Sequence, residues 1–280
     1  MPELPEVESA RSTVERAALH REIAEVDDRD TYVCRPHAPG DLQSALEGRM
    51  LTSAHRRGKT MWCQTSGTGG SADAGPDLGI HLGMAGRIVV TEPGGASDEG
   101  GDWQGGRYGR GAHGADRKPE WDRFTVTFAD GGVLRLFDKR RLGRVRLDPP
   151  VEGLGPDAED ISRAEFVDRV SRGRSPVKAR LLDQAVVAGV GNLLADETLW
   201  QARVAPQRRV DDMSTEELSD LHRALRRATK AAIREGGVHT GEVIRSRRAG
   251  ERCPRCDGEM VRGTVGGRTT WWCAEEQVLP

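Results

Sequence analysis

The stretch LLDQAVVAGVGNLLADE, residues 181–197, is the most informative about the fold, because it joins two helix-like segments through a turn that contains two glycines. Gly189 and Gly191 permit the tight backbone geometry of such a turn. Asn192 follows as a candidate N-cap of the second helix. Consecutive amides at a helix start bind phosphate well, so the turn is either a phosphate-binding element or a purely structural turn between helices.

Helical signals continue on both sides of this turn, over residues 156–236. Gly236 and Gly237 end the last helix. Three pairs of residues mark helix starts, two by capping-box spacing and one by a proline at the first helical position: Ser162 with Glu165, Ser214 with Glu217, and Ser175 with Pro176. This segment is therefore predicted to be a helical domain.

Residues 1–148 instead combine one helix with several strands. The segment PEVESARSTVERAAL, residues 5–19, has apolar or small residues at helical spacing. Two-residue alternation in residues 123–130 and 133–137, on either side of a Gly-Gly pair, predicts a β-hairpin. Further short strands are predicted at 49–53, 60–65 and 85–91. The chain is therefore predicted to be α+β, with an N-terminal β-sandwich that carries one helix.

Two segments interrupt the predicted strands. Residues 66–78 and 93–118 are rich in Gly, Ser and Asp and contain almost no aliphatic residues. Such a composition buries too little apolar surface to offset the entropy of ordering the chain. Both segments are predicted to be mobile loops, inserted without a catalytic role.

Composition excludes some classes of protein. The chain has 280 residues, and no apolar run approaches the ~20 residues that cross a bilayer, which excludes an integral membrane protein. Its first residues, MPELPEVES, lack the basic start and apolar core of a signal peptide. Five cysteines without such a signal argue against a disulfide framework, so we expect a cytoplasmic protein.

The distribution of charge is more informative than its sum. The formal net charge is −2, yet residues 138–148 and 242–268 each carry a local charge of +3, while the first 50 residues are acidic. Binding of nucleic acid depends on where charge lies. The pattern fits either a positive binding face or ordinary solvated charge.

The extreme N-terminus offers a nucleophile. Removal of Met1 before the small residue Pro2 would expose a secondary amine. A free α-amine has a pKa of roughly 7.7–8.0, so an appreciable fraction is neutral and able to attack a carbonyl-like carbon. Glu3 and Glu6 are candidate proton carriers. Taken alone, however, a Pro-Glu terminus is commonplace.

The C-terminal tail contains a candidate metal half-site. Cys253 and Cys256 have Cys-X-X-Cys spacing, and Cys273 follows after sixteen residues. Thiolates at this spacing are typical zinc ligands. Cys34 and Cys63 have no such pattern and are expected to be buried or inert.

Five motifs, in order along the chain, resemble those of the Fpg/Nei family of bifunctional DNA glycosylases, the formamidopyrimidine-DNA glycosylases. They are MPELPEVES at the N-terminus, RRGK at 56–59, HLGMAGR at 81–87, LLDQAVVAGVGNLLADE at 181–197 and GGRTTWWC at 266–273. The resemblance implies a catalytic β-sandwich domain over 1–148, a helix–two-turn–helix domain over 156–241 and a zinc-finger-like β-hairpin over 242–280.

The resemblance also implies roles for individual residues. Pro2 is the nucleophile, which attacks C1′ of the damaged nucleotide, and Glu3 protonates the sugar ring oxygen. Glu6 completes the acidic pair, and Lys59 contacts DNA and the lesion. By the same resemblance, two groups of residues contact DNA. Lys178, Asn192 and Arg268 grip phosphates. Met84, Arg140 and Leu142 fill the gap left by the extruded base. Glu197 matches a structural support.

The sequence departs from the family pattern at two positions. Leu142 stands where formamidopyrimidine-type members usually carry phenylalanine. Glu276 stands where the fourth cysteine of the finger is expected. Three finger sites remain open: three thiolates with Glu276, three thiolates with water, or a finger that folds without metal. We expect structural zinc bound by Cys253, Cys256, Cys273 and Glu276, and no catalytic cofactor.

The implied function is base-excision repair by a monomer that binds damaged double-stranded DNA in the nucleoid. An oxidised base leaves, an iminium forms with Pro2, and β,δ-elimination cuts the strand. Only sixteen residues separate Gly236 from Cys253, fewer than in members that excise 8-oxoguanine efficiently. We therefore expect formamidopyrimidines, hydantoins or oxidised pyrimidines to be preferred. The alternatives are an inactive protein that binds damaged or abasic DNA and, more distantly, a helix–two-turn–helix module in an RNA or ribosomal context.

Overall fold

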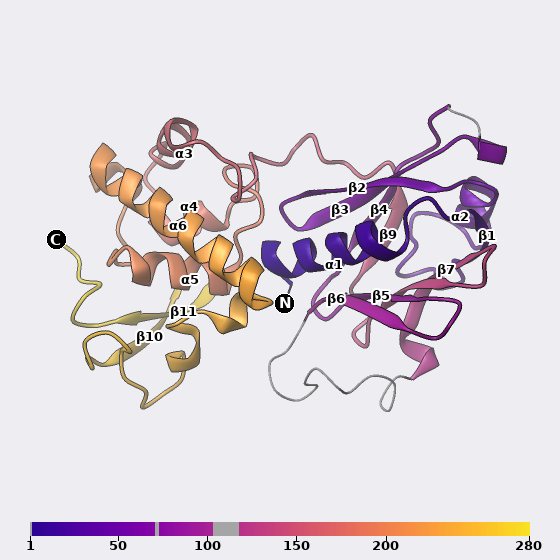
Figure 1. The fold of residues 1–280 in the computed structure, drawn as a ribbon. Helices are drawn as coiled ribbons and strands as arrows, with labels where there is room; N and C mark the ends of the chain where they lie inside the picture. Colours follow the sequence, from indigo (N-terminus) through magenta and orange to yellow (C-terminus); the bar gives the residue numbers. More distant parts are fainter. Residues whose placement is uncertain (1, 71–72, 103–117) are drawn as a thin grey trace. The chain divides into compact units, whose positions relative to one another are not determined.

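Two antiparallel sheets form most of the N-terminal half of the computed structural model, which describes residues 2–70, 73–102 and 118–280 (Figure 1). The larger sheet has five strands in the order β1 (Ile23–Asp27), β7 (Asp122–Phe128), β8 (Val133–Phe137), β5 (Arg87–Thr91) and β6 (Ser97–Gly101). The smaller sheet has four strands in the order β2 (Leu51–Arg57), β3 (Thr60–Thr65), β4 (Leu78–His81) and β9 (Arg144–Leu147).

Apolar residues alternate with polar ones along most of these strands, and the apolar faces of both sheets form one core. Alternate residues of a strand point to opposite faces, so each sheet turns one apolar face inward. The small sheet contributes Met61, Ile80 and Val145 to this core, and the large sheet contributes Ile88, Val126 and Leu136. Helix α1 (Leu4–Ala17) adds Val7, Ala10 and Val14. The short helix α2 (Asp41–Leu46) adds Leu42 and Leu46. The predicted α+β fold with a two-sheet N-terminal part is confirmed.

The prediction for residues 93–118 was wrong in part, because β6 lies within this segment. Its five residues pair with β5 from Arg87↔Gly101 to Thr91↔Ser97. Backbone hydrogen bonds hold this edge strand although its side chains are small or polar. A Cβ on Gly100 would lie 2.3 Å from the carbonyl oxygen of Ser9, so glycine is what lets the strand approach α1. Residues 103–117, and residues 71–72 of the other predicted loop, lie outside the described residues.

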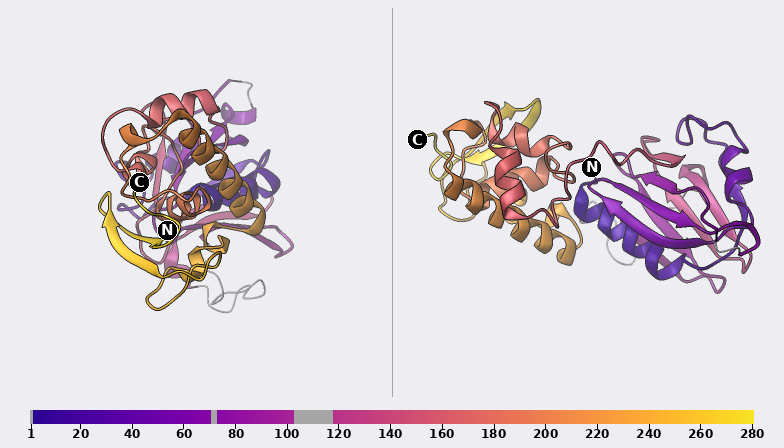
Figure 2. Two further views of the ribbon diagram at one scale, coloured as in Figure 1. Left: turned by 90° about the vertical axis from the view of Figure 1, so that its left-hand side faces the viewer. Right: turned by 90° about the horizontal axis from the view of Figure 1, so that it is seen from above.

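The C-terminal half is helical and ends in a hairpin. It contains α3 (Arg163–Val170), α4 (Val177–Leu182), α5 (Asn192–Gln201), α6 (Thr215–Glu235), β10 (Met260–Val265) and β11 (Arg268–Cys273) (Figure 2). Short 3₁₀ turns lie at η3 (Val210–Asp212), η4 (Val238–Thr240) and η5 (Ile244–Ser246), with η1 (Thr68–Gly70) and η2 (Pro119–Trp121) in the other half. Among the described residues, no helix is both long and apolar enough to span a membrane.

The helix ends follow the predicted chemistry with one shift. Ser214 and Glu217 form a reciprocal capping box, and α6 ends at Gly236 with φ 91°. Ser162 accepts the backbone N–H of Glu165 at 3.2 Å. Helix α4, however, begins at Val177, because Pro176 keeps an extended backbone and is the N-cap rather than the first helical residue.

The chain divides into two compact units. Unit 1 comprises residues 1–2 and 6–152, and unit 2 comprises residues 3–5 and 153–280. Residues 3–5 therefore pack with the helical unit, although Leu4 and Pro5 begin α1, whose other residues belong to unit 1. Leu4, for example, is fully buried in the helical core beside Leu181, Val190 and Leu194.

Candidate functional site

Glu3 is fixed at the start of α5. Its side chain is 1% exposed. Its carboxylate accepts the backbone N–H groups of Gly191 at 3.0 Å, Leu193 at 2.8 Å and Leu194 at 3.0 Å. These are N–H groups that a helix start leaves without partners, and the helix dipole adds positive potential there. A Cβ on Gly191 would lie 2.2 Å from the Glu3 carboxyl carbon, so the glycine of the turn makes room for this carboxylate.

The prediction that Asn192 caps this helix is wrong, because Glu3 occupies that position. Gly191 is the N-cap residue and makes no side-chain bond, while Asn192 is the first residue of α5. The Asn192 side chain instead donates from Nδ2 to the carbonyl oxygen of Thr269 at 2.9 Å. Asn192 thereby ties the turn before α5 to β11, next to Arg268.

Arg268 lies at the tip of the β10–β11 hairpin. It pairs with Val265 across a two-residue turn, and Gly266 and Gly267 both have positive φ, as such a hairpin turn requires. A Cβ on Gly266 would lie 2.9 Å from Ala179, so the tip packs against α4. The Arg268 side chain is exposed. The structure thus brings Asn192 and Arg268 together on the predicted phosphate-binding side of unit 2.

The structure gives Lys178 a different partner from the predicted phosphate. Its side chain is fully buried, with Nζ 2.6 Å from Asp196 Oδ1 and 2.7 Å from Thr270 Oγ1. Arg247 pairs with the other Asp196 oxygen at 2.8 Å. Burial lowers the pKa of Lys178 and raises that of Asp196, although the charge of each partner opposes these shifts. A buried ammonium group needs a paired carboxylate, and Asp196 supplies it.

Glu197, the predicted structural support, is buried beside this pair. Its carboxylate accepts the backbone N–H of Val243 at 3.0 Å and the Gln201 side-chain N–H at 2.8 Å. Burial raises the pKa of this carboxyl group above its ordinary value. The interaction anchors the short segment between α6 and the hairpin to α5.

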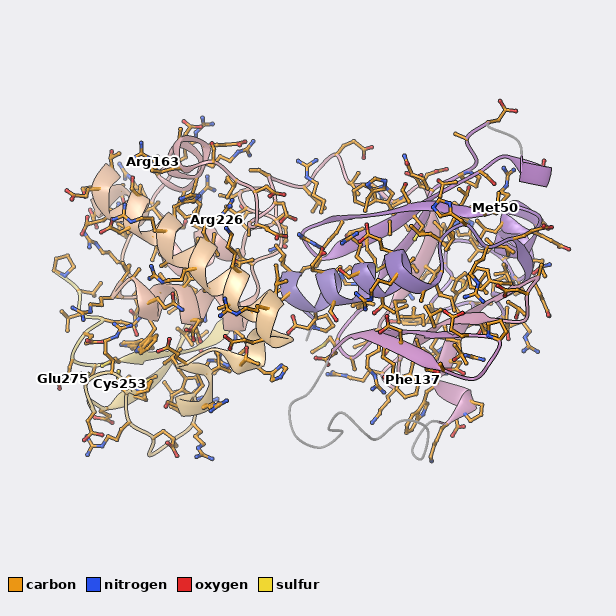
Figure 3. All side chains as sticks on the ribbon, in the orientation of Figure 1. Met50, Phe137, Arg163, Arg226, Cys253 and Glu275 are labelled. Atoms are coloured by element: carbon orange, nitrogen blue, oxygen red, sulfur yellow. The ribbon has the colours of Figure 1, made fainter. Side chains whose placement is uncertain are left out.

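Three cysteines and Glu276 gather around the base of the hairpin, where Figure 3 labels Cys253 and Glu275. One ligand atom from each of Cys253, Cys256, Cys273 and Glu276 lies within 4.8 Å of all the others. Trp200 donates its indole N–H to Cys253 Sγ at 3.3 Å. The Glu276 carboxylate also pairs with Arg255 at 2.9 Å and Arg203 at 3.6 Å. The donor set fits a metal ion, although two guanidinium groups compete for the carboxylate.

In unit 1, Lys59 occupies the turn of the β2–β3 hairpin. Arg57 pairs with Thr60, so Gly58 and Lys59 form a two-residue turn in which Gly58 has φ 60°. Lys59 therefore directly precedes β3, which begins at Thr60 as predicted. Burial of the imidazole ring lowers the pKa of His81, and the charges of Lys59 and Arg144 lower this pKa further. Nδ1 of His81 accepts the backbone N–H of Gly83 at 3.0 Å.

Met84, Arg140 and Leu142 come from two loops that touch. Met84 lies in the turn between β4 and β5, and the other two lie in the β8–β9 loop. A Cβ on Gly83 would lie 2.4 Å from the Leu142 carbonyl carbon, so the loops are in close backbone contact. Arg140 and Leu142 are exposed and Met84 is half-buried. The three residues predicted to fill the gap in the DNA are thus neighbours.

Asp138 holds the β8–β9 loop in shape, and the sequence analysis missed it. Its side chain is fully buried and accepts the backbone N–H groups of Arg140 at 2.9 Å, Leu142 at 2.8 Å and Gly143 at 2.7 Å. An aspartate that begins a loop and bonds backbone two residues on is a recognised turn signal. That signal is present in the sequence at Asp138.

Pro2 and Glu6 are both buried in unit 1. Glu6 lies in the first turn of α1, where its negative charge is favoured by the helix dipole. Met1 lies outside the described residues.

Models of two domains match this chain: the formamidopyrimidine-DNA glycosylase N-terminal domain over residues 1–145, and the formamidopyrimidine-DNA glycosylase H2TH domain over residues 153–242. The chain belongs to the formamidopyrimidine-DNA glycosylase family. Together the two matches cover both the sheet-rich half and the helical half.

Relatives in this family match over the whole chain. A formamidopyrimidine-DNA glycosylase of Nocardioides is 33% identical over 307 residues, which cover 100% of this chain and 95% of the relative. One from Arabidopsis thaliana is 32% identical and covers 100% of this chain and 71% of the relative. A crystal structure of Lactococcus lactis Fpg with DNA containing an abasic site has a TM-score of 0.77 at 25% identity, and covers 98% of this chain and 99% of that chain.

The Asp138 contacts predict a specific loss for this member of the glycosylase family. Asp138→Ala leaves three backbone N–H groups without their acceptor and releases Arg140 and Leu142 from their positions. A loop without these bonds must be ordered again on binding, and we expect affinity for duplex DNA with an abasic site to fall about tenfold, which corresponds to an ordering cost of ~1.4 kcal/mol. Fluorescence anisotropy measures this. Asp130→Ala, in an exposed turn of the same sheet, is the control, and equal losses in both variants would contradict the role of Asp138.

Proposed function

We propose that this protein is a bifunctional DNA glycosylase of base-excision repair, which removes oxidised bases and cleaves the resulting abasic site through the amine of Pro2. The observation that carries the proposal is the placement of Glu3. The residue that follows the predicted nucleophile is buried and held by three N–H groups, so the chain beside Pro2 is fixed in place. A positioned nucleophile with an adjacent acid is the arrangement that iminium chemistry needs.

In this mechanism the neutral Pro2 nitrogen attacks C1′ as the bond to the base breaks, and the base leaves with that electron pair and a proton. Glu3 protonates the sugar ring oxygen, the ring opens, and the nitrogen lone pair completes the iminium. In the structure Oε2 of Glu3 accepts two of the three backbone bonds and Oε1 accepts one. These bonds hold the Glu3 carboxyl group at the start of α5 while it transfers its proton. Loss of protons from C2′ and then C4′ expels the two phosphates in turn.

The remaining predicted residues divide between the two units in this proposal. Asn192 and Arg268 of unit 2 grip the backbone of the damaged strand, and Lys59 of unit 1 contacts DNA near the lesion. Met84, Arg140 and Leu142 fill the gap left by the flipped nucleotide, where an apolar wedge offsets part of an unstacking cost of a few kcal/mol. In this proposal the three predicted domains, residues 1–148, 156–241 and 242–280, provide the catalytic part, the DNA-binding helices and the finger.

The short segment after α6 supports a preference against 8-oxoguanine. Six of the sixteen residues 237–252 lie in the 3₁₀ turns η4 and η5, and Val243 between these turns is anchored to Glu197. This anchored, short segment offers less chain to close over a base than a longer one would. Leu142, 38% exposed, also offers less surface than the phenylalanine usual in formamidopyrimidine-type members.

The test of this function is borohydride trapping of the Met1-processed protein on duplexes that each carry one lesion. We expect a covalent adduct with an abasic site, and faster adduct formation with a formamidopyrimidine, a hydantoin or thymine glycol than with 8-oxoguanine opposite cytosine. Fastest trapping with 8-oxoguanine would reject the argument from segment length. Tight binding without any adduct would instead favour the inactive damage-binding protein, which the replacement of the fourth finger cysteine by Glu276 supports.

We propose further that the hairpin binds structural zinc through Cys253, Cys256, Cys273 and Glu276, which supplies no step of the reaction. Structural zinc sites nearly always use Cys and His, and Arg255 and Arg203 compete here for the carboxylate. We therefore expect Glu276→Cys to bind zinc at least about tenfold more tightly than the natural chain, because thiolate is the better ligand. Competition with a chromophoric chelator measures this, and Glu275→Cys is the matched control. Equal affinities in the two variants would remove Glu276 from the site.

A further inference from the structure

A groove with a volume of about 320 Å³ lies on unit 1 beside the β8–β9 loop. Its walls come from β3, β4 and β9, from Leu142 and from two prolines that follow β9. Arg144 and Arg146 line it together with Thr60 and His81. The proposed function uses none of the β9 residues.

The strand geometry explains why both arginines face this groove. Arg144 and Arg146 are two residues apart on β9, so their side chains point to the same face, while Val145 between them is fully buried in the core. Arg144 pairs with His81 and Arg146 with Gly79 on the neighbouring strand β4. A Cβ on Gly79 would lie 2.7 Å from the Pro149 ring, so the glycine makes room for this proline, which lines the groove opposite Arg146.

These two guanidinium groups differ from most arginines of unit 1 in their partners. Most of the others pair with a carboxylate, as do Arg11, Arg16, Arg21, Arg56, Arg87, Arg123 and Arg141. Within residues 2–70, 73–102 and 118–152, no acidic side chain lies within ion-pair distance of Arg144 or Arg146. Partial burial of the Arg144 side chain lowers its pKa, and the positive charges of Arg35 and Arg146 lower this pKa further. Adjacent guanidinium groups without a counter-charge form a site for an anion with several oxygens, such as a phosphodiester.

Leu142 indicates which phosphodiester this is. Leu142 forms part of the groove wall, and its loop also carries Arg140. In the proposed function this loop meets the base that loses its partner, and that base belongs to the undamaged strand. The backbone phosphates beside it are therefore the anions nearest to the groove.

We propose that Arg144 and Arg146 form a second DNA-binding site, which holds backbone phosphates of the undamaged strand beside the orphaned base. This inference rests on the proposed function, because that function places the wedge loop in the duplex. The groove then lets the protein hold both strands at the lesion, in addition to the damaged-strand contacts of unit 2.

The test compares Arg144→Gln/Arg146→Gln with Arg16→Gln/Arg29→Gln. Both double variants remove two positive charges from unit 1, and Arg16 and Arg29 are exposed arginines outside the groove. Affinity for a duplex that contains a tetrahydrofuran abasic analogue is measured from ~50 to ~200 mM salt, where each lost phosphate contact reduces the slope of log K against log salt by about 0.9. We expect the groove variant to lose between about one and two units of slope and the control variant to keep the natural slope.

Two further measurements identify the strand. Neutral methylphosphonates placed in the undamaged strand beside the orphaned base should weaken binding of the natural protein tenfold or more, on the order of two lost phosphate contacts, and leave the groove variant unaffected. Borohydride trapping on single-stranded abasic DNA should be the same for the natural protein and the groove variant. A salt slope of the groove variant equal to that of the natural protein, or an equal methylphosphonate effect in both proteins, would overturn the proposed phosphate site. Absence of trapping by the natural protein would instead overturn the proposed lyase, so the two failures are distinct.

Discussion

Replacement of Pro2 by glycine is expected to reduce borohydride trapping on abasic DNA at least about hundredfold, the scale on which a positioned catalytic group contributes. Glycine removes the secondary amine and the ring that restricts its orientation. Glu3 next to it keeps its three bonds to the start of α5, so the loss should fall on chemistry rather than folding. Single-turnover trapping with excess protein measures the effect.

Pro5→Gly is the matched control, because it makes the same exchange three residues further along the chain. It should trap the abasic duplex within a fewfold of the natural protein. Both variants should bind a tetrahydrofuran duplex with nearly natural affinity. Undiminished trapping by Pro2→Gly would place the nucleophile elsewhere in the chain.

Replacement of Asp196 by alanine should destabilise unit 2 by about 3–5 kcal/mol, because it leaves a buried ammonium group without its carboxylate. Lys178 and Asp196 are both fully buried, and Arg247, with 12% of its side chain exposed, loses the same partner. Hydrogen exchange of the α5 amides measures the free energy of opening in this unit.

An exposed pair provides the control for this prediction. Asp168 and Arg172 lie 2.6 Å apart, but their side chains are 60% and 67% exposed. Asp168→Ala should therefore cost less than about 1 kcal/mol. Adding Lys178→Met to Asp196→Ala removes the uncompensated charge and should recover part of the lost stability. If the single and double variants open with equal free energies, the ion pair does not stabilise α5.

Local signals in the sequence predicted the elements that depend on local chemistry. The capping-box pair Ser214 and Glu217 and the terminal Gly236 together predicted α6, and the Gly-Gly pair predicted the hairpin between β7 and β8. Family resemblance then supplied the grouping of Met84, Arg140 and Leu142, which come from two separate loops.

Interactions between distant residues were not predictable in this way. Nothing near Asn192 indicates that a carboxylate from residue 3 takes its place as the cap, because that bond spans 188 to 191 residues. Lys178 likewise has the charge of a phosphate ligand, and only the packing of α4 against α5 and β11 shows that Asp196 neutralises it. Strand β6 has no apolar alternation because it is an edge strand held by backbone bonds.

The capping of α5 by Glu3 also sets an order of events during synthesis. The ribosome makes Glu3 about 190 residues before Leu194, and at ~5–20 residues per second this interval lasts on the order of 10 to 40 seconds. Throughout that time Glu3 has no α5 to cap. Residues 3–5 can join unit 2 only after the turn at Gly191 has left the ribosome. One of the first segments to be synthesised is therefore among the last to reach its final contacts.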